Sequence, residues 1–280
     1  MLGKLIKHDF LANARFLGPA YIVMLIIALF GRFFTWLATR KAIMDAVAPA
    51  FGNIIKLLSS LLTVAFVIAP FAILFAAAFF VIYRFYKNIF TDEGYLMNTL
   101  PTRPVNLVFS KLLNALIWML ITIVVAGLSW YLAVGHLDGL RDVLTQIWDT
   151  IINLFLSNRE AIHEQLGVPI WLFIVELVFF ILCWFARFAI SWFFAIAFGQ
   201  LIAKNHKVLG AIGAYVGLAI VSNIFSTAYL GALGKVINNV ASNGLALQYT
   251  MMGNAVLFLI ITGLLYWATT SIMKNRLNLD

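Results

Sequence analysis

The chain has 280 residues, of which 64% are hydrophobic and 11% are charged, and its formal net charge is +8. Soluble domains have about 45–50% apolar and about 25% charged residues, so this composition excludes a water-soluble fold and, equally, a disordered chain. Hydrophobic blocks of about 18 residues or more recur along the sequence, which predicts a polytopic helical membrane protein. The basic excess is then expected in cytoplasmic loops, and nucleic acid is not expected as a partner.

The N-terminal segment, residues 1–15, predicts an amphipathic helix that lies in the inner headgroup layer. Lys4 and Lys7 lie opposite an apolar stripe that consists of Leu2, Leu5, Ile6 and Phe10. Asp9 also falls on this stripe, which leaves a frayed tail as the alternative. No signal-peptidase site follows the first hydrophobic block, so we expect that block to remain in the protein as a span.

Six hydrophobic spans predict a single all-α transmembrane domain over residues 1–280. The spans lie at residues 16–34, 57–83, 105–132, 170–199, 208–226 and 249–273. An even number of spans places both ends of the chain on one side of the membrane. Basic residues are denser in the segments on that side than in the opposite ones, so the positive-inside rule predicts cytoplasmic termini.

The second span carries an aromatic stripe. Phe71, Phe75 and Phe79 recur at four-residue spacing, and Pro70 precedes them as an expected kink. Such a stripe fits the wall of a path for a lipophilic substrate. Contact with lipid or packing on a neighbouring helix is the alternative.

The inner loop at residues 84–104 is the most distinctive polar segment. It begins with two basic residues, becomes acidic, and then presents apolar side chains before two prolines that mark the start of the next span. This pattern fits a short helix that docks on a partner protein, and a solvated linker is the alternative. The candidate contact residues are Asp92, Glu93, Gly94, Tyr95 and Leu96.

The outer segment at residues 136–169 predicts a second amphipathic helix. Apolar residues recur at helical spacing opposite Asp138, Asp142 and Asp149. The apolar set is Leu137, Leu140, Leu144, Ile147, Trp148, Ile151 and Phe155. This helix is expected to rest on the outer leaflet or to cap a pathway, with packing against the span ends as the alternative.

The fourth span contains two charged residues, Glu176 and Arg187. They share a helix face but lie about 16 Å apart along the axis, which excludes a direct bridge within the helix. A lipid-facing cation at mid-span costs about 2.5–3.5 kcal/mol, so Arg187 is expected to face a protein interior or an aqueous cavity. Its partner is then expected on another span, in a structural or a path-lining role, while Glu176 is near enough to the outer end to reach the headgroups.

The fifth span combines small and polar residues. Gly213 and Gly217 form a G-x-x-x-G pattern, preceded by Gly210, which permits close approach of another helix. Toward the outer end, Ser222, Asn223 and Ser226 lie within about one turn and are further candidates for a substrate path.

Residue patterns of enzymes are absent from the sequence. The single cysteine, Cys183, and four scattered histidines predict no metal site. The segment 231–235 has the wrong spacing for a phosphate-binding loop. We therefore expect no catalytic residues and no cofactor on this chain.

The loop sequence from Thr91 to Pro101, TDEGYLMNTLP, followed by Lys111, resembles the loop between spans two and three of ABC-transporter permeases. The group is the bacterial second-type permeases, which have the type V exporter fold. The opening segment 1–10 and the closing segment 273–279 resemble the termini of bacterial members. A more specific similarity is to permeases of Firmicutes that export amphipathic, membrane-active peptides.

The resemblance implies an exporter permease in the bacterial cell membrane that works by alternating access. Two six-span permease chains, expected as a homodimer, would pair around a path lined by spans two and five. Two copies of a separate subunit would bind ATP and Mg. Each would receive a cytosolic coupling helix formed by residues 92–96.

Two other functions fit the composition. An ion-coupled secondary transporter would need carboxylates deep in its spans, where Glu176 is the single acidic candidate. A non-catalytic immunity or scaffold protein would need no particular set of residues. A co-purifying ATP-binding subunit, or a phosphate-loop ATPase in the neighbouring reading frame, would distinguish the exporter from both.

Overall fold

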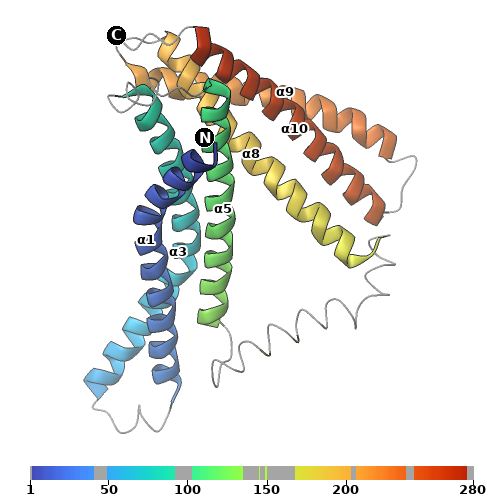
Figure 1. Cartoon of the computed structure of the whole chain (residues 1–280). Coiled ribbons are helices and arrows are strands. Elements are labelled where there is room, and N and C mark those ends of the chain that lie inside the picture. The colour runs from blue at the N-terminus through green and yellow to red at the C-terminus, as the bar shows by residue number, and fades with distance from the viewer. Residues whose placement is uncertain are drawn as a thin grey trace. The chain divides into compact units, whose positions relative to one another are not determined.

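The structure, a computed structural model, describes residues 2–40, 49–91, 103–134, 145, 149, 168–202, 206–237 and 243–275. These residues form six long α-helices (Figure 1). The helices are α1 (Leu2–Thr39), α3 (Pro49–Phe90), α5 (Pro104–Val134), α8 (Ile170–Ile202), α9 (Lys207–Ile237) and α10 (Asn243–Asn275). All six are long and apolar enough to cross a membrane, which confirms the prediction of a multi-pass helical protein.

The starts of three helices lie at or next to a proline, and for the second helix this start precedes the predicted hydrophobic span. Pro49 and Pro104 occupy first helical positions, where the missing N–H leaves no hydrogen bond unmade. The second helix therefore begins at residue 49 instead of 57 and reaches 42 residues. Pro169 precedes α8 in the same way, and its carbonyl accepts the first two helical hydrogen bonds.

The N-terminal segment 1–15 and the first span form one helix and not two. Helix α1 runs without a break for 38 residues and includes Pro19. Lys4 and Lys7 are exposed as expected, but Asp9 is only 2% exposed. The stripe that carries Asp9 is therefore covered by protein.

The chain divides into two compact units, and α3 and α5 contribute to both. The N-terminal unit contains residues 3–81 and 117–143. The C-terminal unit contains residues 82–116 and 144–280, together with residues 1–2. Each unit is described by itself.

The N-terminal unit is built on one buried stripe of α1. The stripe residues recur every three or four positions, the spacing of a helix face that packs on other helices. They are Asp9, Asn13, Leu17, Tyr21, Met24, Ala28 and Gly31. Leu17 and Tyr21 cluster with Ala77 of α3 and Trp118 of α5, and Phe10 stacks on Trp118 at a ring separation of 5.0 Å.

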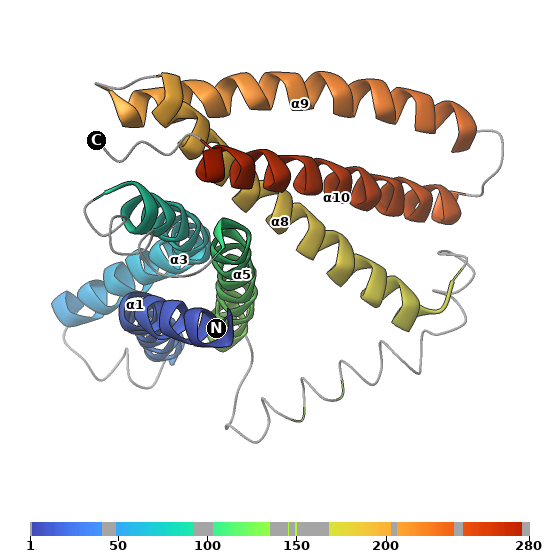
Figure 2. The same cartoon turned by 45° about the horizontal axis from the view of Figure 1, so that its top comes forward.

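The C-terminal unit is organised around α8, which packs against both α9 and α10 (Figures 1 and 2). Near its end, α8 touches the start of α9 through Gly199. A Cβ atom at this glycine would lie 2.4 Å from the backbone nitrogen of Ala211, so the crossing requires a residue without a side chain. On α10, a Cβ at Gly253 would lie 2.7 Å from the hydroxyl of Tyr229 of α9, so the third pair of helices also meets at a glycine.

The end of α3 and the start of α5 are fixed to the same unit. Phe85 of α3 stacks on Phe193 of α8 at 3.8 Å with nearly parallel rings, and both side chains are almost fully buried. The hydroxyl of Tyr266 of α10 donates a 2.7 Å hydrogen bond to the backbone oxygen of Val105. Both helix ends that flank residues 92–102 are therefore held by the helices of the C-terminal unit.

Candidate functional site

The candidate site lies at the middle of the membrane-spanning helices α8 and α9. Arg187 is about 26 Å from the first residue of α8 and about 22 Å from its last by helical rise. Ser222, which the predicted span 208–226 placed toward its outer end, lies at the midpoint of α9 because the helix continues to Ile237. Polar side chains from the middle of two apolar helices, each long enough to cross a membrane, thus line one site.

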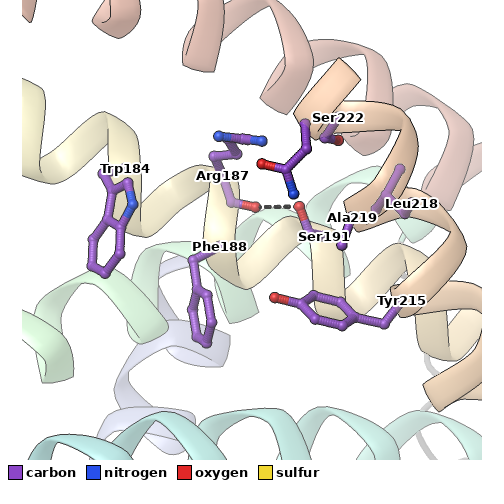
Figure 3. Close-up of a pocket in the computed structure, with 9 residues that line it drawn as sticks. Trp184, Arg187, Phe188, Ser191, Tyr215, Leu218, Ala219 and Ser222 are labelled. Carbon is purple, nitrogen blue, oxygen red and sulfur yellow. Dashed lines mark hydrogen bonds between the residues drawn. The ribbon is translucent and has the colours of Figure 1, made fainter. Parts of the chain in front are cut away.

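These residues line a partly open cavity of about 330 Å³ (Figure 3). Helix α8 contributes residues at positions i, i+3, i+4 and i+7, which share one helix face. The α8 residues are Trp184, Arg187, Phe188 and Ser191. Those from α9 are Tyr215, Leu218, Ala219, Ser222 and Asn223. The structure therefore brings together Arg187 with Ser222 and Asn223, which the sequence had singled out on two separate spans.

Arg187 contacts an aromatic ring and no acid. Its guanidinium carbon lies 4.8 Å from the ring centroid of Phe258 of α10, a cation–π contact. Within the part of the chain that the structure describes, no carboxylate pairs with Arg187 and its guanidinium makes no hydrogen bond. The prediction of a partner on another span is confirmed, but the partner is an aromatic face that leaves the positive charge uncompensated.

The rest of the polar wall consists of neutral groups. The ring of Tyr215 stacks on Trp192 at 3.8 Å, which fixes its orientation. The side chains of Tyr215, Ser222 and Asn223 make no hydrogen bond to any other residue in the described ranges. Ser191 donates to the backbone oxygen of Arg187 at 2.7 Å (Figure 3). Hydrogen-bonding capacity is therefore available at the cavity wall.

Two of the other predicted polar residues lie outside the cavity wall. Ser226, one turn beyond Ser222, has a buried hydroxyl with no hydrogen-bond partner among the described residues. Glu176 does not line the cavity, and its Oε2 atom is buried without a hydrogen-bond partner in the described part of the chain. The residue as a whole is only half-buried, and the expectation that Glu176 reaches the headgroups stays a prediction.

The aromatic stripe of the second span projects outward from α3. Phe71, Phe75 and Phe79 are 60%, 76% and 71% exposed, and Pro70 at the head of the stripe is buried. A face this apolar and this exposed must be covered by lipid or by another protein chain in the membrane. Both predicted roles of the stripe remain predictions.

The glycines of the fifth span divide into two groups. Gly210 takes part in the close crossing with α8, since its carbonyl carbon lies 2.6 Å from the Cβ position of Gly199. Around the Cβ positions of Gly213 and Gly217, no described atom lies within 4 Å. Close helix packing within the chain therefore occurs at Gly210, while the G-x-x-x-G pair faces outward.

The proposed contact residues, from Asp92 to Leu96, lie outside the described residues. So does the predicted outer helix at 136–169, apart from Thr145, Asp149 and the two residues before α8. Lys111, the basic residue that follows the loop motif, is only 6% exposed.

Some lining residues were not predicted from the sequence. Trp184, Phe188 and Ser191 follow from Arg187 by helical spacing and were recoverable in that way. Phe258 lies on another helix, in a cluster with Ala255 and Cys183, and no local pattern marks it. Among the described residues, no group of His, Cys, Asp or Glu is arranged to hold a metal ion.

Comparison with known proteins adds no relative: no family model, curated protein or solved structure matches this chain.

Proposed function

We propose that this chain is the permease subunit of an ATP-driven ABC exporter in a bacterial cell membrane. The observation that carries the proposal is the position of the TDEGYLMNTLP segment. It falls between the second and third of six candidate spans, where the permeases it resembles carry their coupling helix. Residues 92–96 would contact a separate ATP-binding subunit, two copies of which bind ATP and Mg.

The contacts that flank this segment support a mechanical role. Phe85 and Val105 stand on either side of the loop, and they contact Phe193 of α8 and Tyr266 of α10 respectively. A displacement of the loop would therefore be transmitted to α8 and α10, and those helices carry Arg187 and Phe258. ATP-driven closure of the partner subunits could thereby alter the mid-span cavity, as alternating access requires.

The cavity supports transport over a passive scaffold. A scaffold has no need of an uncompensated cation at mid-membrane, because such a group costs about 2.5–3.5 kcal/mol at the bilayer centre. A path for amphipathic molecules, membrane-active peptides among them, needs both polar and apolar walls. The cavity offers both, through Arg187 and Asn223 on one hand and Trp184 and Phe188 on the other.

Two exposed helix faces support pairing with a second permease chain. Gly213 and Gly217 leave open space beside α9, where another helix can approach closely. The aromatic stripe of α3 is exposed as well. A homodimer that covers one or both faces would enclose a central path.

The test is the activity of the chain purified from its own cells together with its bound ATPase. Glu93→Lys reverses a charge at the proposed contact and is expected to lower permease-stimulated ATP hydrolysis by about tenfold or more. Glu176→Gln, an acidic residue away from the loop, is the matched control and is expected to leave stimulation unchanged. Retained coupling in Glu93→Lys, or no associated ATPase in the native preparation, would count against the proposal.

A further inference from the structure

The cavity around Arg187 has the chemistry of an anion-binding site. Its one formal charge is positive, and its other polar groups are the hydroxyls of Tyr215 and Ser222 and the amide of Asn223. None of these side chains makes a hydrogen bond to another residue in the described part of the chain. A cationic ligand would be repelled by the guanidinium, and a neutral ligand would leave its positive charge uncompensated in a region of low dielectric constant.

Packing against an aromatic ring holds the half-buried guanidinium at the cavity wall. The cation–π contact with Phe258, 4.8 Å from the guanidinium carbon to the ring centroid, packs the group against α10. One aromatic ring cannot occupy all five N–H groups of a guanidinium, so donors stay available for an anionic acceptor. Trp184, Phe188 and Leu218 complete the wall as apolar surfaces.

We propose that this cavity binds a single anionic group, a carboxylate, phosphate or sulfonate, that is attached to an apolar body. The anionic oxygens would accept hydrogen bonds from Arg187, with Ser222 and Asn223 as further donors. The apolar body would lie against Trp184 and Phe188. A volume of about 330 Å³ fits a charged group with a short hydrocarbon chain, and the open side allows a longer body to extend outward.

This inference rests on the proposed function in one respect: if the chain is a permease, the anionic group would belong to the molecules that it transports. Binding itself is tested on the chain alone, without any ATP-binding subunit. A failed ATPase experiment therefore leaves the binding test valid, and a failed binding test leaves the coupling test valid.

The experiment uses the full chain in phosphatidylcholine nanodiscs and a six-carbon alkyl sulfonate with a terminal bromine atom, which quenches nearby indole fluorescence. Subtracting the signal of Trp184→Phe isolates the quenching of the tryptophan in the cavity wall. The sulfonate is expected to bind about tenfold more tightly than the matched bromo-alcohol, the discrimination typical of one close charge pair. Equal binding of the two probes would overturn the proposal.

Variants assign the discrimination to Arg187. Arg187→Gln is expected to reduce sulfonate binding to the level of the alcohol, while Arg187→Lys retains part of the preference because it keeps the charge but loses the planar set of donors. Lys235→Gln, at the far end of α9, is the matched control and should change nothing. A sulfonate preference that survives in Arg187→Gln would overturn the assignment. If Arg187→Gln does not fold, the comparison of the two probes on the native chain and on Arg187→Lys still decides the question.

A lipid arm identifies the source of the anionic group. Nanodiscs that contain phosphatidylglycerol, assayed at high salt to screen surface charge, present the same anionic chemistry on a membrane lipid. Weaker sulfonate binding in them supports the site and assigns it to lipid headgroups. Unchanged binding supports the site and assigns it to a transported molecule.

Discussion

Several hydroxyl groups in the apolar helices are stabilised by a backbone oxygen of the same helix or by one partner on another helix. Thr122 shows both arrangements, since its hydroxyl donates to the backbone oxygen of Trp118 at 2.7 Å and lies 2.6 Å from the hydroxyl of Tyr21. Because the hydrogen of Thr122 is already used, Tyr21 is the donor of the contact between α1 and α5. Arg187 differs, because its charge is left for a ligand.

The Tyr21–Thr122 hydrogen bond yields a stability prediction. Tyr21→Phe and Thr122→Val should each lower the free energy of unfolding in detergent by about 0.5–1.5 kcal/mol. The double variant should reveal a coupling of about 0.6 kcal/mol, as is typical of hydrogen bonds between membrane helices. Thr122→Ser keeps the hydroxyl and is the control. Strictly additive losses would show that the two hydroxyls do not interact.

Helix crossings in the C-terminal unit depend on glycines that hydropathy does not reveal. Gly199 permits the crossing of α8 and α9, while Gly213 on α9 faces open space. The sequence pattern singled out Gly213 and Gly217 because they form G-x-x-x-G. It missed Gly199 because the partner of that residue becomes a neighbour only after the chain turns between the two helices.

The same substitution at these two glycines should have opposite effects. Gly199→Ala places a Cβ against the backbone of Ala211 and should lower the free energy of unfolding of the monomer by about 1–3 kcal/mol. Gly213→Ala meets nothing within the chain and should be neutral or stabilising by up to about 1 kcal/mol, because alanine favours the helix. Equal effects of the two changes in a denaturation series would contradict the packing described for α8 and α9.

How well each feature of the helices could be predicted from the sequence depends on the physical interaction that determines it. Hydropathy depends only on the residues within each segment. It was therefore sufficient to predict the six apolar helices and their order along the chain. The ends of the helices depend on local backbone chemistry, so Pro49 extended the second helix by two turns beyond the apolar block. The burial of Asp9 depends on tertiary contact, so the sequence could place this residue on the apolar stripe but could not show that protein covers the stripe.

At the scale of the whole molecule, some residues of the candidate site could be identified from the sequence and others only from the structure. A charge in an apolar span marks a buried or cavity-lining position on energetic grounds alone, which is why Arg187 could be singled out. The identity of its neighbours depends on how α8, α9 and α10 cross. The contact with Phe258 and the cavity wall from Tyr215 to Asn223 therefore required the structure.

The central claim is that energy enters this chain through residues 92–96 from a cytosolic ATP-binding subunit. The most direct measurement is the labelling of Tyr95→Cys, in a Cys183→Ala background, by a maleimide that cannot cross membranes. Asp149→Cys, on the predicted outer segment, is the control for the opposite face.

We predict that Tyr95→Cys is labelled in inside-out vesicles but not in intact cells, and that the bound ATP-binding subunit protects it. Labelling of Tyr95→Cys from the outside of intact cells would contradict the account.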